Sequence, residues 1–141
     1  MIAQKNEQVE RELEKLVSII QEVIPSVNEI RVFGSYNNGN WNPEKSDVDV
    51  FVETADEDYS RMRFFFNFFP IIPYESNKRK GIRKEIFQKL GANPNRLSMN
   101  FFSSSDVQIF RENYRSNMIC VIESMKSGRL LYQNKQIPMT N

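Results

Sequence analysis

The chain has 141 residues, 40% hydrophobic and 26% charged, a composition typical of one soluble globular domain over residues 1–141. Nineteen Lys and Arg residues against 18 Asp and Glu residues give a net charge of +1, so no global field favours nucleic acid or an anionic membrane. Zero His and one Cys exclude His-activated nucleophiles, His-ligated metals, cysteine zinc cages and intrachain disulfides. Carboxylates, hydroxyls, amides, Lys and Arg remain, and they favour a hard cation such as Mg²⁺ if a metal is used.

The sequence carries no pattern of a secretory signal or a membrane segment. Residues 1–16 are charged throughout and lack an apolar core. The most apolar stretch, residues 64–74, is about half as long as a membrane-spanning helix requires and contains two prolines. We therefore expect a cytoplasmic protein that does not bind membranes.

The spacing of apolar residues divides the chain into helices and strands. Spacings of three and four predict helices, strict alternation predicts strands, and Gly, Pro and Asn mark the turns. The predicted elements are, in chain order, a helix over 9–24, a strand over 29–33, a strand over 48–52, a helix over 54–69, a helix over 82–90, a strand over 97–102, a helix over 105–125 and a strand over 130–132. This order predicts an α/β (α+β) fold with a small mixed β-sheet covered by helices.

Local signals predict where three of these helices begin or end. Thr54 with Glu57, and Ser105 with Gln108, have the spacing of a capping box at a helix N-terminus. Gly91 follows the helix over 82–90, at the position where glycine is the preferred residue type.

The segment from Val32 to Val52 combines a Gly-Ser turn with two aspartates. Residues two apart in a strand point to one face, so Asp47 and Asp49, predicted within the second strand, direct both carboxylates the same way. Two such anions repel each other unless solvent, a cation or a basic partner compensates, and they can share a divalent cation. Gly34 and Ser35 end the preceding strand and are predicted to open a short helix, where backbone N–H groups and a hydroxyl can bind phosphate. The segment therefore predicts a phosphate site beside a Mg²⁺ site, the apparatus for nucleotidyl transfer.

The same segment resembles the motif of the minimal nucleotidyltransferase family, the small members of the DNA polymerase β-like superfamily. It reads Phe33-Gly34-Ser35, eleven residues, and then Asp47-Val48-Asp49-Val50. Ser46, Gly39 and the ending Ser127–Tyr132 are also similar to the family.

The resemblance implies the nucleotidyltransferase fold and a nucleoside triphosphate as substrate. By this resemblance Gly34 and Ser35 contact the triphosphate, and Asp47 and Asp49 hold Mg²⁺ or Mn²⁺ as catalytic residues. The implied reaction transfers a nucleoside monophosphate, AMP from ATP, to an acceptor hydroxyl. In single-domain relatives that resemble antitoxins, the acceptor is a tyrosine of a helical HEPN protein partner.

One feature of the family is missing, namely a third carboxylate on the following strand. The matching positions here are Ser98 and Asn100, of which neither is an acid, and Glu75 or Asp106 is a substitute only if the chain folds back suitably. The basic residue that many relatives have shortly after the Gly-Ser turn is also missing, because Tyr36, Asn37 and Asn38 stand there. A second hypothesis is therefore a nucleotide-binding or protein-interaction module of the same fold without turnover.

Three further features leave alternatives open. Five phenylalanines within residues 64–69 are too many for one helical face, which favours core packing plus a self-association surface over base stacking. The basic run Lys78–Lys84 is typical of a solvated helix face, although contact with the triphosphate or with nucleic acid stays an alternative. Trp41 either forms a wall of a base pocket or anchors the loop between the two halves of the motif.

Overall fold

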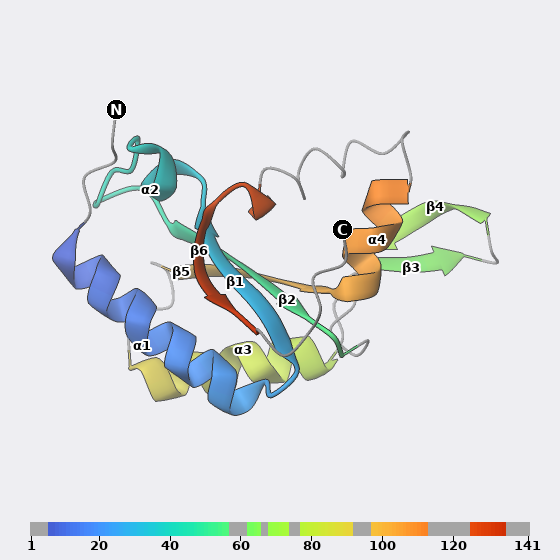
Figure 1. The fold of residues 1–141 in the computed structure, drawn as a ribbon, viewed down its shortest axis with the longest axis horizontal. Coiled ribbons are helices and arrows are strands. Elements are labelled where there is room, and N and C mark those ends of the chain that lie inside the picture. The colour runs from blue at the N-terminus through green and yellow to red at the C-terminus, as the bar shows by residue number, and fades with distance from the viewer. Residues whose placement is uncertain are drawn as a thin grey trace.

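The computed structural model describes residues 6–56, 62–65, 68–73, 77–91, 97–112 and 125–134 of the chain. Figure 1 shows the helices and strands of this described part. Their bounds are α1 (Glu7–Val23), β1 (Val27–Phe33), α2 (Ser35–Asn38), β2 (Val48–Thr54), β3 (Met62–Phe65), β4 (Phe68–Pro73), α3 (Asn77–Leu90), β5 (Leu97–Ser103), α4 (Ser104–Glu112) and β6 (Arg129–Gln133). Of the long helix expected over 105–125, residues 113–124 lie outside the described part.

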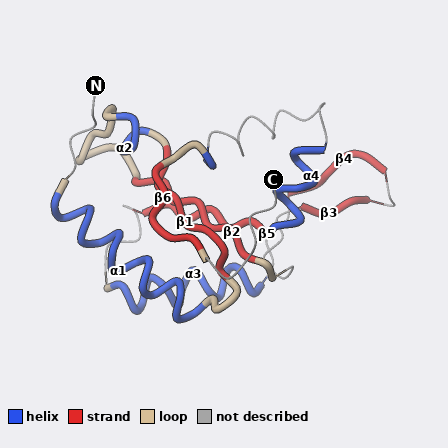
Figure 2. Tube along the Cα trace, viewed as in Figure 1, coloured by secondary structure: helices blue, strands red, loops and turns tan. Residues whose placement is uncertain are grey.

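Four strands form a mixed sheet in the order β5-β2-β1-β6. β1 is antiparallel to β2 and to β6, whereas β2 is parallel to β5. β3 and β4 form a separate antiparallel pair, which Figure 2 colours as strands. The expected α/β (α+β) class with a small mixed sheet is therefore confirmed.

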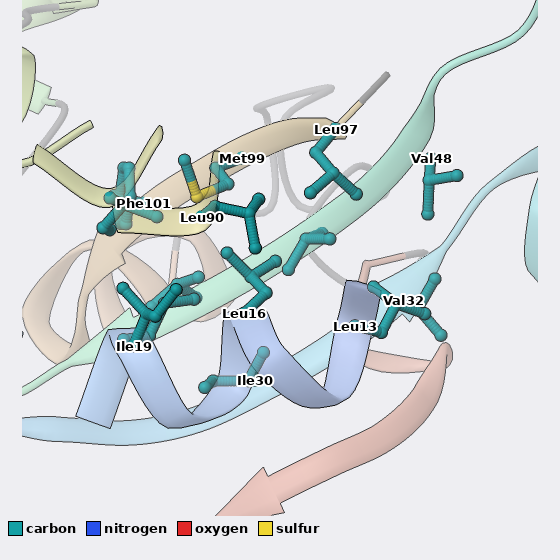
Figure 3. Close-up of a cluster of buried hydrophobic side chains, with 14 of the residues drawn as sticks. Leu13, Leu16, Ile19, Ile30, Val32, Val48, Leu90, Leu97, Met99 and Phe101 are labelled. Atoms are coloured by element: carbon teal, nitrogen blue, oxygen red, sulfur yellow. The ribbon is translucent and has the colours of Figure 1, made fainter. Parts of the chain in front are cut away.

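The main core lies between one face of this sheet and the helices α1 and α3, which Figure 1 shows together on that side. Apolar residues three and four apart give α1 one buried stripe, and every second residue of β2 from Val48 to Val52 is fully buried. Figure 3 shows side chains of these elements pointing toward one another, among them Leu13, Leu16, Ile19, Ile30, Val32, Val48, Leu90, Leu97, Met99 and Phe101.

The opposite face of the sheet carries a smaller apolar cluster together with the polar side chains of the motif. Phe51 and Phe102 lie on neighbouring strands with ring centroids 5.6 Å apart, and Val107 of α4 and Met125 pack against them. Asp49 is two residues before Phe51 in β2 and therefore shares this face. The site is thus separated from the main core by the sheet itself.

The prediction of a helix over 54–69 is wrong. β2 continues through Thr54, whose hydroxyl lies 2.6 Å from the Ser26 hydroxyl and accepts a hydrogen bond from the Asp56 N–H, so it fixes a turn. The aromatic stretch then forms β3 and β4, consistent with the preference of Phe and Ile for strands. In the described part of the chain, no helix is long and apolar enough to cross a membrane.

The helix ends follow the sequence signals in one case and depart from them in another. α3 ends at Gly91 with a φ of 67°, as expected. α4, by contrast, begins two residues earlier than the Ser105 and Gln108 pair predicts. Ser103 Oγ accepts from the Asp106 N–H and Asp106 Oδ2 accepts from the Ser103 N–H, both at 3.1 Å. The capping box is therefore Ser103 with Asp106.

Two glycines outside the motif give a matched test of this packing. A Cβ at Gly128 would overlap the Val32 carbonyl oxygen and crowd Phe33, whereas a Cβ at Gly81, exposed in α3, would meet no atom within 4 Å. We expect Gly128→Ala to lower the free energy of unfolding by about 1–3 kcal/mol, and Gly81→Ala to raise it by about 0.5–1 kcal/mol. Urea unfolding of both variants measures the difference, and equal shifts would contradict the packing of β1 against the turn before β6.

Candidate active site

The antiparallel pairing of β1 and β2 brings the two halves of the motif together. Phe33, the last residue of β1, is paired with Asp49, so the following Gly34 lies beside that aspartate. A Cβ on Gly34 would be 2.5 Å from Asp49 Oδ2, and the φ of Gly34 is 75°. Only glycine therefore fits here without displacing the carboxylate or straining the backbone.

The turn after β1 is a short helix, as the sequence predicts. Asn38 N donates to the Gly34 carbonyl and Asn40 N donates to the Ser35 carbonyl, each at 3.0 Å. Gly39 ends α2 in the left-handed conformation with a φ of 85°. These bonds fix the Gly34–Ser35 backbone and leave the Ser35 side chain, which is half-buried, at the start of the helix.

The two aspartates differ in position and exposure. Asp47 lies directly before β2 and not within it, which corrects the prediction, and its side chain is exposed. Asp49 is within β2 and half-buried. Burial, and secondly the negative charge of Asp47, raise the pKa of Asp49 above its ordinary value of 3.8. The two carboxylates therefore repel each other, and a cation bound between them would relieve that repulsion.

The register of β2 and β5 shows which of the two candidate residues, Ser98 or Asn100, lies beside Asp49. Ser98 is the β5 residue paired with Asp49. Asn100 is paired with Phe51, which lies two residues further along β2, away from Asp47. The side-chain Nδ2 of Asn100 donates hydrogen bonds to the backbone carbonyls of Val50 and Ser98, each at 3.3 Å. Ser98 is therefore the β5 residue beside Asp49, and its side chain carries a hydroxyl in place of a carboxylate.

No third acid replaces it in the part of the chain that the structure describes. There, no group of three or more His, Cys, Asp or Glu residues is placed to hold a metal ion. The alternative Asp106 is wrong, since its carboxylate is fully buried in the capping box at the other end of β5. Glu75 lies outside the described residues.

The loop between the two halves of the motif is anchored by Trp41. Its Nε1 donates to the Ser46 carbonyl at 3.0 Å, and its ring stands edge-on to that of Tyr36 at 5.2 Å between centroids. These contacts favour the loop anchor over the wall of a base pocket.

The basic residues of α3 lie away from Asp49. Lys80 and Lys84 are exposed on this helix, which covers the sheet face opposite to that of Asp49. The Arg83 guanidinium lies 5.7 Å from the centre of the Phe101 ring. This placement favours the solvated helix face over contact with the triphosphate; the side chains of residues 78 and 79 lie outside the description.

Glu10 and Arg129 were not predicted from the sequence. They connect α1 and β6 to Tyr36, the residue after Ser35. The Tyr36 hydroxyl donates a hydrogen bond to Glu10 Oε2, and the Arg129 guanidinium donates to the same oxygen, although Arg129 is 119 residues from Glu10 in sequence. No local pattern marks these residues, because the contacts depend on the packing of three separate elements.

Comparison with known proteins identifies the family. Residues 13–116 match the model of the nucleotidyltransferase domain, so the chain belongs to that family. This match includes both halves of the motif and confirms the resemblance described above. No curated protein matches the chain significantly.

Two solved structures are similar to it. A toxin–antitoxin crystal structure with AMP-PNP is 18% identical, with a TM-score of 0.48 over 88% of this chain and 75% of that chain. A protein from Sulfolobus solfataricus, provisionally described as a nucleotidyltransferase, is 12% identical, with a TM-score of 0.43 over 75% of this chain and 82% of that one.

The raised pKa of Asp49 predicts how stability depends on pH in the absence of metal. A carboxyl whose pKa is higher in the folded than in the unfolded chain lowers stability once it ionises. Asp49→Asn should therefore raise the melting temperature at neutral pH. The gain in melting temperature over wild type should be near zero below pH 3.8. It should grow as the pH rises through the folded-state pKa of Asp49, and then level off. Thermal melts in EDTA across this range measure it, and a variant no more stable than wild type at neutral pH would contradict it.

Proposed function

We propose that the chain is a Mg²⁺-dependent nucleotidyltransferase that transfers AMP from ATP to an acceptor hydroxyl. The observation that carries this proposal is the position of the Asp49 carboxylate against the Gly34 backbone, with the charge of Asp47 beside it. A phosphate held at Gly34 and a cation held at Asp49 would then be neighbours. This adjacency is what in-line displacement at a phosphate requires.

The residues present fit a hard divalent cation, Mg²⁺ or Mn²⁺, because the donors are carboxylate oxygens of Asp47 and Asp49. When bound, the ion would neutralise charge on the triphosphate and on the leaving pyrophosphate. The Gly34 backbone and the Ser35 hydroxyl would orient the phosphates. The acceptor oxygen forms a bond to the α-phosphorus, the bond to the bridging oxygen breaks, the hydroxyl proton passes to water, and pyrophosphate leaves.

We further propose that the acceptor is a tyrosine of a helical HEPN-type protein. The support is the motif around Asp47 and Asp49, which resembles that of single-domain members of the family.

Residues 64–69 are the proposed surface for self-association. The strands that include most of them, β3 and β4, form a sheet separate from the four-stranded one, which supports this assignment.

A second candidate function is a nucleotide-binding module without turnover. The observation in its favour is Ser98, which stands beside Asp49 where a third acid would complete the site. A serine hydroxyl supplies neither the charge nor the basicity of a carboxylate.

Two measurements separate these functions. The first is thermal stabilisation by ATP with and without Mg²⁺, and the second is pyrophosphate release with HEPN-type proteins as acceptors. Stabilisation with release supports the enzyme, and stabilisation without release for any acceptor supports the binding module. No Mg²⁺-dependent stabilisation would contradict both.

The third position gives a gain-of-function test. Ser98→Asp places a carboxylate beside Asp49, and we expect pyrophosphate release to rise at least about tenfold, because a positioned acid or base contributes 10²–10⁴-fold. Ser18→Asp, which adds the same charge on the exposed surface of α1, is the matched control and should leave the rate unchanged. A Ser98→Asp rate equal to that of wild type would show that this is not the position of a missing acid.

A further inference from the structure

Tyr36 directly follows Ser35, and its side chain is held inside the fold. Its exposed fraction is 4%. The hydroxyl donates to Glu10 Oε2 at 2.6 Å and accepts from the Asn6 N–H at 3.1 Å. Asn6 is the N-cap of α1, so the proposed phosphate-binding turn is fixed to the start of that helix.

The anchor of Tyr36 is in turn fixed to the sheet. Arg129 of β6 donates to Glu10 Oε2 at 2.8 Å, so one carboxylate oxygen holds both side chains. Arg129 is paired with Val32, two residues before Gly34. The turn is therefore attached to α1 and to β6 as well as to β1.

Trp41 continues this set of contacts across the loop. Its ring stands edge-on to Tyr36, with an interplanar angle of 86°, and its Nε1 donates to the carbonyl of Ser46. Ser46 directly precedes Asp47 and is also bonded to Asn42 through both its backbone N–H and its hydroxyl. The loop end that carries Asp47 is thus held by a side chain that rests on Tyr36.

We infer that Tyr36 and Trp41 are positioning residues that fix the distance between the Gly34–Ser35 turn and Asp47. This inference rests on the proposed function. Asp49 needs no such help, because β2 pairs with β1 at that residue. Asp47 lies directly before the strand, so the loop contacts of the preceding Ser46 help to hold its carboxylate in place for a shared cation. Holding donors before the ligand arrives reduces the ordering cost of binding.

Two conservative variants test this. Tyr36→Phe keeps the ring but loses both hydroxyl bonds, and Trp41→Phe keeps an aromatic ring but loses the bond to Ser46. We expect each to weaken binding of Mn²⁺·AMP-PNP about three- to tenfold by calorimetry, at a temperature where every variant is folded. The double variant should weaken it by less than the product of the single effects, because both side chains hold one loop.

Two controls separate positioning from general stability. Tyr132→Phe removes a tyrosine hydroxyl from β6, and Ile20→Val removes a methylene from the buried core of α1; both should bind like wild type. Wild-type affinity in Tyr36→Phe and Trp41→Phe would overturn the inference while leaving the proposed function intact. Failure of wild type itself to bind would overturn the proposed function, and the inference with it.

Discussion

Replacing Asp47 and Asp49 together with asparagine is expected to lower nucleotide transfer about 10³-fold or more and to abolish stabilisation by Mg²⁺·ATP. Asparagine has nearly the same shape as aspartate, so the fold and the β1–β2 pairing are retained. The variant loses both negative charges and therefore the attraction that holds a divalent cation. Metal-free protein should become more stable, since the burial of a charged Asp49 carboxylate and its repulsion by Asp47, which together raise the pKa of Asp49, no longer disfavour the folded state.

The control for this variant removes two charges elsewhere. Glu44 lies exposed in the same loop and Glu14 lies exposed on α1, so Glu14→Gln with Glu44→Gln changes the net charge by the same amount. Transfer rate and Mg²⁺·ATP stabilisation should stay within about twofold of wild type, as expected for weakly interacting surface charges. If both double variants lose stabilisation equally, the metal site is not at the two aspartates.

Gly34→Ala should strongly reduce nucleotide transfer by a different route, with all the charges left in place. The new Cβ would lie 2.5 Å from Asp49 Oδ2, so either the carboxylate or the turn must move. A displacement of about 1 Å in a catalytic site can cost about 10²-fold in rate. We therefore expect at least a 10²-fold loss of transfer and a weaker affinity for Mn²⁺·AMP-PNP.

Gly91→Ala is a matched control for the backbone strain. Gly91 has a φ of 67°, close to the 75° of Gly34, but a Cβ there would meet no atom within 4 Å. Both alanine variants should lose about 1 kcal/mol of stability from the left-handed backbone, and only Gly34→Ala should lose binding and transfer. Equal losses of binding in both would indicate a general effect of stability.

The small mixed sheet, and the meeting of Gly34 with Asp49 in the candidate site, could be predicted because their signals are local. Alternation predicted β1 and β2 closely, and the antiparallel pairing of these strands places Asp49 beside Gly34. The family match over residues 13–116 agrees with that motif. Which of Ser98 and Asn100 stands next to Asp49 could not be predicted, since it depends on the β2–β5 register.

The errors have physical causes that short patterns do not carry. Thr54 has the spacing of a helix cap, but its hydroxyl bonds to Ser26, 28 residues away, and the chain continues as a strand. Asp106 is an acid close to β5 in sequence, yet it caps α4. Tyr36 in sequence marks only the absence of a basic residue, whereas in the fold it connects the turn to α1 and β6 through Glu10.

We propose that the two halves of the motif form one site for a metal-bound nucleotide. Anomalous diffraction from crystals grown with Mn²⁺·AMP-PNP tests it most directly, because manganese gives a peak whose position needs no assumption about the site. We predict a peak between the carboxylates of Asp47 and Asp49, with the triphosphate on the Gly34–Ser35 turn. Nucleotide bound elsewhere on the chain, or bound with no manganese at these aspartates, would contradict the account.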